Sequence, residues 1–284
     1  MHGEPRNLRR VESQLATGTG RMLFRRAWLP EQPERVLLVV HGFAEHSGRY
    51  EHFGAWFAAR GCAVHAYDHQ GHGRSEGVRG HVRRFGDFLD DLDAMLAAVR
   101  AEHPGLRPQL VGHSMGGLIV AASLCERAPD VAGAVTSGAA LAISDDLSRG
   151  RILAARALRR VAPRLALASG LDPEGLSKDP EVVRAYVEDP LVFRRMTTSL
   201  AVELMGAIER TAGSADRVSV PLLMLHGEAD PICPVAGTQG FFERLVVEPR
   251  RIQTYPGLRH EIFNEPEHAR VFEDVLAWVQ ARAR

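Results

Sequence analysis

Residues 109–127, QLVGHSMGGLIVAASLCER, constrain the fold of this chain more than any other stretch. They place a short apolar run before a G-x-S-x-G pentapeptide centred on Ser114, and a helix-forming run after it. A serine in this pattern between a strand and a helix stands on a sharp, strained turn, where side chains two residues before and after it would collide. The pattern therefore predicts a strand whose end presents the Ser114 hydroxyl at the edge of a sheet.

Short apolar runs alternate with helical patterns along most of the chain. The expected strands are residues 35–40, 62–68, 108–112, 131–138, 221–227 and 250–257, and the expected helices are residues 50–60, 82–103, 116–127, 238–246 and 266–283. These strands are continuously apolar and most are followed by a helix, which predicts an α/β fold with a mostly parallel sheet covered on both faces. A hairpin at residues 11–30, with its turn at 17–20, brings the expected sheet to eight strands.

Residues 143–217 interrupt this alternation. They contain helix-forming sequence, such as GRILAARALRRVAPRLALA and TTSLAVELMGAIERT, but no clear strand. Open α/β sheets bind ligands beyond the carboxyl ends of their strands, and a helical insertion between two strands is expected to cover those ends. We therefore expect a core of residues 1–142 and 218–284 with a helical cap at 143–217.

Composition narrows the function classes. The chain has 284 residues, 45% of them hydrophobic, which is enough for one large core. Its 35 basic and 35 acidic side chains cancel without forming a block of like charge, so no nucleic-acid partner is expected. There is no signal-peptide pattern or long apolar span, and the three separated cysteines do not resemble a disulfide framework or a zinc site. A cytoplasmic globular protein is the expectation.

The Ser114 hydroxyl is a weak nucleophile near neutral pH, so it needs a base and a third group that orients the base. In this type of sheet the chain order is serine, acid, histidine, with the last two on loops after late strands. Asp230 follows the expected strand 221–227, and His260 follows the expected strand 250–257. We therefore predict a catalytic triad in which Ser114 attacks, His260 is the base and Asp230 orients it.

Rival residues exist for the acid and for the base. Glu228 lies two residues before Asp230, but Asp230 is farther into the loop and is the preferred acid. His268 falls on the last expected helix, facing away from the strand ends, so His260 is the preferred base. Two further histidines lie beside the predicted chemistry but inside rigid elements, and we interpret them as structural imidazoles: His113 and His226.

Acyl transfer also needs N–H donors for the negative charge of the tetrahedral intermediate. One is expected to be the backbone amide of Met115, directly after the nucleophile, and the other comes from the loop after an earlier strand. That loop begins at His41, where Gly42 lets the chain turn so that the amide of Phe43 points inward. The other polar residues of this loop are expected to brace it rather than react: Glu45, His46, Ser47 and Arg49.

With these motifs the chain resembles α/β-hydrolases of the monoacylglycerol lipase family, also described as lysophospholipase-like or serine aminopeptidase-like hydrolases. The resemblance implies an α/β-hydrolase fold, the triad Ser114, Asp230 and His260, and an oxyanion hole at Phe43 and Met115. It also implies hydrolysis of one ester bond of a monoacylglycerol to glycerol and a fatty acid, with no metal and no organic cofactor. The stretches that carry it are HGFAEHSGRY (41–50), YDHQGHGRSEG (67–77), GHSMGG (112–117), LSKDPEVVRAYVEDPLVF (176–193), LHGEAD (225–230) and GLRHEIFNEP (257–266).

Two classes of alternative stay open. A lysophospholipase, a short-chain carboxylesterase or an aminopeptidase would keep the triad and change the pocket. A ligand sensor with a hydrolase fold would keep the fold without turnover.

Three other features have competing interpretations. A run at the end of the strand 62–68 could be a metal site, but a turn held by side-chain hydrogen bonds is preferred because the run spans a strand end and a glycine-rich loop. Cys233 is interpreted as a small buried hydrophobe. In the cap, a basic amphipathic segment either contacts an anionic lipid surface or is a solvated face, with Pro163 limiting its helix. The residues of the run are His65, Asp68, His69 and His72, and those of the segment are Arg156, Arg160 and Arg164 with Leu158, Val161 and Leu165.

Overall fold

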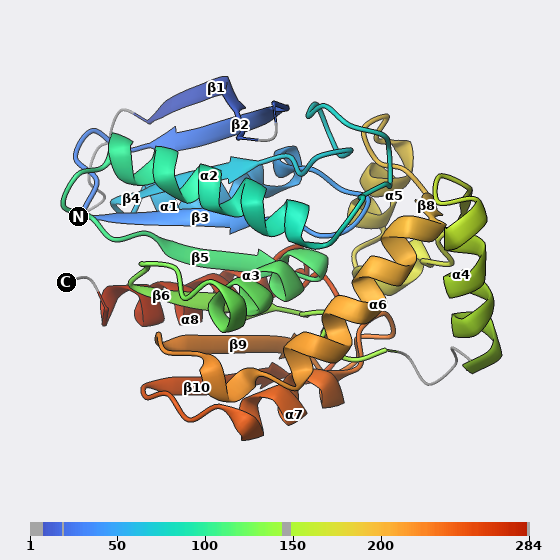
Figure 1. Ribbon diagram of the computed structural model, residues 1–284. Helices are drawn as coiled ribbons and strands as arrows, with labels where there is room; N and C mark the ends of the chain where they lie inside the picture. Colours follow the sequence, from blue (N-terminus) through green and yellow to red (C-terminus); the bar gives the residue numbers. More distant parts are fainter. Residues whose placement is uncertain (1–7, 19, 144–148, 283–284) are drawn as a thin grey trace.

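The computed structural model describes residues 8–18, 20–143 and 149–282. Its centre is an eight-stranded sheet with the order β1-β2-β4-β3-β5-β6-β9-β10 (Figure 1). The strands of this sheet are β1 (Arg9–Ala16), β2 (Met22–Leu29), β3 (Arg35–Val40), β4 (Cys62–Tyr67), β5 (Gln109–His113), β6 (Gly133–Ser137), β9 (Leu222–Gly227) and β10 (Arg250–Tyr255). The α-helices are α1 (Glu51–Ala58), α2 (Gly86–Glu102), α3 (Met115–Glu126), α4 (Arg149–Val161), α5 (Pro180–Glu188), α6 (Thr198–Ala212), α7 (Val235–Arg244) and α8 (His268–Gln280).

The strand pairing confirms the predicted mostly parallel sheet. From β4 to β10 every neighbouring pair is parallel, whereas β2 pairs antiparallel with both β1 and β4. The predicted hairpin is β1-β2, whose register runs from Arg9 opposite Leu29 to Ala16 opposite Met22. Of its predicted turn, residue 19 lies outside the described residues. Each predicted core strand forms within two residues of its expected bounds.

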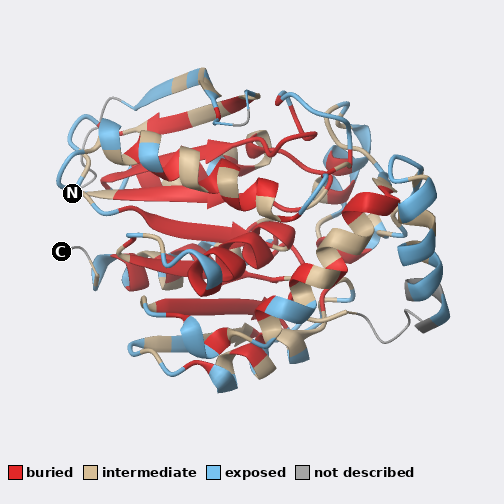
Figure 2. Cartoon of the chain, viewed as in Figure 1, coloured by how far each residue is buried: buried red, intermediate tan, exposed pale blue. Residues whose placement is uncertain are grey.

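Helices cover both faces of the sheet because its central strands are apolar on both sides. Strands β4, β5, β6 and β9 are buried along their whole length, whereas β1 alternates between exposed and half-buried residues (Figure 2). One face packs against α1 and α8, through Phe53 and Phe272. The other packs against α2, α3 and α7, through Phe88, Ile119 and Phe241. Covering both faces is what a parallel sheet requires.

The segment between β6 and β9 holds α4, α5 and α6 together with a two-stranded antiparallel sheet of β7 (Ala166–Ala168) and β8 (Arg195–Thr197). The expectation that this segment contains no strand is therefore wrong. Both strands are three residues long, too short for a sequence pattern, and each depends on a partner far along the chain. Helix α4 ends two residues before Pro163, as the proline predicts. Residues 144–148, near the start of the predicted cap, lie outside the described residues.

This segment gathers beyond the end of the sheet toward which β5 and β9 run (Figure 1). Helix α6 crosses from there onto the core, where it packs against α3 and α7. The loops that follow β5 and β9 therefore open toward α5 and β8. No helix in the described ranges is both long enough and apolar enough to cross a membrane.

Candidate active site

Ser114 stands on a strained turn between β5 and α3. Its φ of 54° and ψ of −118° are rarely adopted by a residue with a side chain. A Cβ atom at Gly112 would lie 2.5 Å from the carbonyl oxygen of Gly116, and one at Gly116 would overlap the carbonyl oxygen of Val40. The predicted steric need for both glycines is confirmed. Ser114 is half-buried between fully buried neighbours, so its side chain can reach solvent.

His260 and Asp230 form a hydrogen-bonded pair after β10 and β9. The distance from His260 Nδ1 to Asp230 Oδ2 is 2.7 Å. The other carboxylate oxygen accepts from the backbone N–H groups of Ile232 and Cys233, at 2.8 and 2.9 Å. With Asp230 ionised and accepting, Nδ1 of His260 carries the proton and Nε2 is left with a lone pair. This is the tautomer that can accept a proton from a serine.

The charges of the pair support this assignment. Burial by itself would raise the pKa of Asp230, but the positive charge available on His260 and the hydrogen bonds to the carboxylate hold that pKa well below its usual range. Burial by itself would lower the pKa of His260, yet the Asp230 carboxylate outweighs it and the pKa of His260 is raised. Asp230 therefore stays ionised, and its charge favours the protonated form of the His260 imidazole.

Several contacts bring the three predicted residues to one place. Strands β5, β6 and β9 are neighbours, so the loops after them share one edge of the sheet. The thiol of Cys233 lies beside Ser114, while its backbone N–H donates to Asp230. A Cβ atom at Gly138, after β6, would lie 3.2 Å from Nδ1 of His260. Cys233 is buried, as expected, and it borders the site.

The loop after β3 lies directly against the nucleophile. A Cβ atom at Gly42 would be 3.1 Å from Cβ of Ser114. In the part of the chain that the structure describes, neither the Phe43 nor the Met115 backbone N–H donates a hydrogen bond to the protein. Met115 opens α3, and the first N–H groups of a helix have no partner within it. Both predicted donors are therefore beside Ser114 and available to a ligand oxygen.

A buried ionic network holds this loop against the histidine loop. Oε1 of Glu45 accepts from the Gly42 N–H at 2.6 Å and from the Tyr50 hydroxyl at 2.8 Å. Arg49 donates to Oε2 of Glu45 at 3.0 Å and to both carboxylate oxygens of Glu261, the residue after His260, at 2.5 and 2.8 Å. The bracing role expected for Glu45 and Arg49 is thus realised through a partner, Glu261, that the sequence analysis missed.

The two carboxylates of this network differ. Burial raises the pKa of Glu45. Burial would also raise the pKa of Glu261, but the charge and hydrogen bonds of Arg49 outweigh it and lower that pKa to about 2. Both groups are almost fully buried. The single guanidinium therefore keeps Glu261 ionised in a buried position, whereas burial still outweighs its effect on Glu45.

Ser47 and His46 brace the same loop from other sides. The Ser47 hydroxyl donates to Oδ1 of Asp68 at 2.5 Å, and Oδ2 of Asp68 accepts from the Arg74 N–H at 2.7 Å. His46 accepts at Nδ1 from a backbone N–H, so its Nε2 donates to Asp189, 2.8 Å away in the segment after α5. The glycine-rich turn after β4 is thus held by side-chain hydrogen bonds, as preferred from sequence.

The histidines of that turn pack around His41. The His69 N–H donates to Nε2 of His41 at 3.0 Å, which leaves Nδ1 of His41 to donate to the Gly42 carbonyl at 2.7 Å. Burial lowers the pKa of His69 to about 4 and that of His72 to about 3. These imidazoles are neutral packing groups that hold the backbone of the loop after β3 through His41. His65 points away from them, toward α2.

The rival acid and base lie elsewhere. Glu228 is exposed and accepts from the Thr254 hydroxyl at 2.7 Å. His268 donates to the Glu265 carbonyl at the start of α8. Neither contacts the Ser114 turn in any interaction that the structure describes. The geometry therefore favours the pair chosen from sequence.

Two structural histidines flank the pair. Burial lowers the pKa of His113 to about 3, and its ring lies 4.7 Å from that of His260. Nε2 of His226 is 2.9 Å from the Cys233 carbonyl and 3.1 Å from Oδ2 of Asp230, and its Nδ1 is 2.8 Å from a threonine hydroxyl. His226 therefore orients Asp230, a role that its position inside a buried strand did not suggest.

The chain is similar to known proteins in sequence and in structure. Residues 31–267 match the family model described as serine aminopeptidase, S33. The monoacylglycerol lipase of Mycolicibacterium smegmatis is 38% identical over 254 residues, covering 89% of this chain and 90% of its own, and human monoglyceride lipase is 34% identical over 273 residues, covering 94% and 90%. The crystal structure of Paleococcus ferrophilus monoacylglycerol lipase is 35% identical and superposes with a TM-score of 0.84, covering 92% of this chain and 99% of its own. This chain belongs to the serine aminopeptidase S33 family of α/β-hydrolases, together with these monoacylglycerol lipases.

Proposed function

We propose that this protein is a serine hydrolase that cleaves the ester bond of monoacylglycerols to glycerol and a fatty acid. The observation that carries the proposal is the His260–Asp230 pair beside the strained Ser114, with two unengaged N–H groups at the same turn. The substrate class rests on the similar relatives, which are monoacylglycerol lipases by name.

The reaction proceeds through an acyl-enzyme intermediate. Ser114 attacks the ester carbonyl while Nε2 of His260 takes its proton, and Asp230 stabilises the resulting imidazolium. The amides of Phe43 and Met115 donate to the oxyanion. His260 then protonates the departing glycerol oxygen. It next takes a proton from a water molecule, whose attack on the acyl-enzyme releases the fatty acid and restores Ser114.

Residues 143–217 act in this proposal as a cap over the site. Two side-chain contacts support it. The His46 imidazole is hydrogen-bonded to the Asp189 carboxylate, and the ring of Phe43 packs edge-on against that of Phe193, with the ring centroids 5.4 Å apart. The backbone of Phe193 also donates to the Ala44 carbonyl at 3.3 Å. Because these contacts start from the oxyanion loop, the Phe43 and Phe193 rings narrow the acyl entrance next to the reacting carbonyl.

The deciding experiment compares wild type with Ser114→Ala. The variant should stay folded, with an unchanged circular dichroism spectrum, and lose at least ~10³ in kcat because the oxyanion hole and binding alone give only residual catalysis. Substantial ester hydrolysis by the variant would refute the proposal. So would unlabelled wild type that reacts with a fluorophosphonate at Ser114 but shows no fast multiple turnover of an ester. The substrate classes are separated by comparing hydrolysis rates on monoacylglycerols, diacylglycerols, lysophospholipids, short p-nitrophenyl esters and an aminoacyl amide.

Helix α4 supplies a surface for transient docking on anionic lipid, where monoacylglycerols reside. The described residues of α4 are mostly exposed (Figure 2). Val161 is 80% exposed and Leu153 is 64% exposed, on a helix that is otherwise rich in arginine. An ordinary packed helix would bury these side chains, whereas an interfacial helix places them in the lipid and its arginines at the headgroups. Leu165 and Leu167, just after the helix, extend the apolar surface.

The docking proposal is tested with vesicles. Replacing Arg156, Arg160 and Arg164 together by glutamate should weaken binding to anionic vesicles, and Val161→Asn should weaken it without changing the charge. Neutral vesicles serve as the control for the electrostatic part. Equal binding of wild type and the triple variant to anionic vesicles would exclude the arginine contribution.

A further inference from the structure

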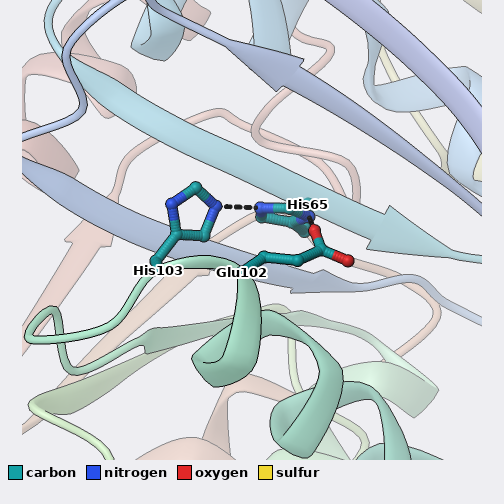
Figure 3. Close-up of side chains that lie close together, drawn as sticks. All are labelled: His65, Glu102 and His103. Atoms are coloured by element: carbon teal, nitrogen blue, oxygen red, sulfur yellow. Dashed lines mark hydrogen bonds and ion pairs between the residues drawn. The ribbon is translucent and has the colours of Figure 1, made fainter.

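A second cluster of chemically active side chains lies where the end of α2 meets β4 (Figure 3). His65 comes from the middle of β4, Glu102 is the last residue of α2, and His103 follows it. The two Nε2 atoms of the histidines are 2.8 Å apart, and Nδ1 of His65 is 3.9 Å from Oε2 of Glu102. One donor atom from each side chain lies within 4.8 Å of one from each of the others.

The cluster faces a cavity rather than the packed core. This cavity has a volume of about 330 Å³ and is lined by these three residues and by residues of strands β1 and β2, among them Arg9, Arg25 and Arg26. His65 is buried, His103 is half-buried and Glu102 is exposed, so a small ligand can enter from solvent and still reach the buried imidazole. The site is separate from the catalytic machinery, which follows the carboxyl ends of β3, β5, β9 and β10.

The donor set suits a borderline transition-metal ion. Two imidazole nitrogens and one carboxylate are the ligands of many Zn²⁺ sites, with a water molecule in the fourth position. A metal ion binds the neutral form of imidazole, in which one ring nitrogen of each histidine offers a lone pair. Arg25 donates to the other oxygen of Glu102 at 2.5 Å and holds the carboxylate over His65.

We propose that His65, Glu102 and His103 form a binding site for a single divalent transition-metal ion of the Zn²⁺ type. Two nitrogens bound to one Zn²⁺ at ~2.0–2.1 Å lie roughly 3.3 Å apart in a tetrahedral site. The imidazoles therefore need to separate by about half an ångström and to turn so that both lone pairs converge on the ion, which replaces their mutual hydrogen bond. His103 can make this adjustment because it lies just past the end of α2, with φ −130° and ψ 66°.

A bound ion would tie the end of α2 to β4. Because it binds the folded chain, it should raise the midpoint of thermal unfolding, by roughly 5 °C at a free concentration ~100 times the Kd. It should leave ester hydrolysis unchanged, since no residue of the site contacts the Ser114 turn. This stabilisation without a change in kcat distinguishes the site from a catalytic metal.

The test uses the full chain after dialysis against EDTA. Co²⁺ is titrated while its visible absorption reports a tetrahedral nitrogen and oxygen environment, and Zn²⁺ stoichiometry is measured by equilibrium dialysis. Wild type should bind one equivalent. Glu102→Gln and His103→Ala, both at accessible positions, should each weaken binding at least ~10-fold. The matched control is His268→Ala, which removes a half-buried histidine from another histidine pair and should bind as wild type.

Two results would overturn the site: less than a fifth of an equivalent bound at micromolar Zn²⁺, or binding by both donor variants as tight as that of wild type. Weakening by His268→Ala equal to that by His103→Ala would also overturn it, because the ion would then be held by surface histidines in general. Ser114→Ala should bind the metal as wild type does. The metal site and the proposed ester hydrolysis can therefore fail independently.

Discussion

Replacing Asp230 by asparagine tests the acid–base pair most directly. The backbone N–H groups of Ile232 and Cys233 both donate to Oδ1, so the side-chain oxygen of an asparagine must occupy that position. Its NH₂ group then takes the position of Oδ2, 2.7 Å from Nδ1 of His260. Because NH₂ is a donor, His260 must accept at Nδ1 and carry its proton on Nε2. That tautomer cannot take a proton from Ser114.

The expected loss follows from two effects of Asp230→Asn. The wrong tautomer predominates, and the imidazolium loses its stabilising negative charge. Together these effects are worth ~10⁴ in kcat for triads of this kind, or about 5.4 kcal/mol in the activation barrier. Folding should be largely preserved, since the two backbone hydrogen bonds to the side-chain oxygen remain.

The assay is steady-state hydrolysis of a monoacylglycerol and of a p-nitrophenyl ester, with thermal unfolding as the check on folding. Glu228→Gln is the matched control, because Glu228 is the rival acid in the same loop and its only described side-chain partner is Thr254. It should retain kcat within about threefold. If Asp230→Asn kept more than a tenth of wild-type kcat, or if Glu228→Gln lost more than Asp230→Asn did, the tautomer argument would be wrong.

Three further predictions follow from the same geometry. Activity needs neutral His260, whose pKa is raised, so kcat/KM should rise with pH with its midpoint above 6.5; a midpoint below 6 in a pH–rate profile would contradict the effect of Asp230. Gly116→Ala should lower the free energy of unfolding in urea by ~3 kcal/mol or more, because the new Cβ would overlap a carbonyl oxygen. Gly240→Ala in α7 places its Cβ in open space and should raise the free energy of unfolding by ~0.5–1 kcal/mol. Similar effects of the two substitutions would refute the steric account. Arg49→Gln should lower the free energy of unfolding by ~3–5 kcal/mol, because it leaves two buried carboxylates without their cation. The control, Arg184→Gln, changes an exposed ion pair and should leave the unfolding midpoint unchanged. Equal midpoints for the two variants would show that the buried network adds no stability.

The sheet and the nucleophile turn were predictable because their signals are local. Continuous apolar runs locate the parallel strands, and the glycines around Ser114 are required by crowding within a few residues. The chain order serine, acid, histidine then limits the candidates for the acid and the base to the loops that hold Asp230 and His260. The two strands β7 and β8 were missed because three residues carry no periodicity, and their pairing exists only after the segments around them have folded.

The sequence by itself determined the strands of the main sheet, the helices that flank it, and which loops hold Ser114, Asp230 and His260. Only the tertiary structure decided which distant side chains meet. Arg49 reaches Glu261, His46 reaches Asp189, and His65 reaches Glu102 and His103 across packed elements. The physical reason is that periodicity and turn chemistry act between neighbours in the chain, whereas these contacts depend on how helices and strands far apart in sequence are oriented and packed.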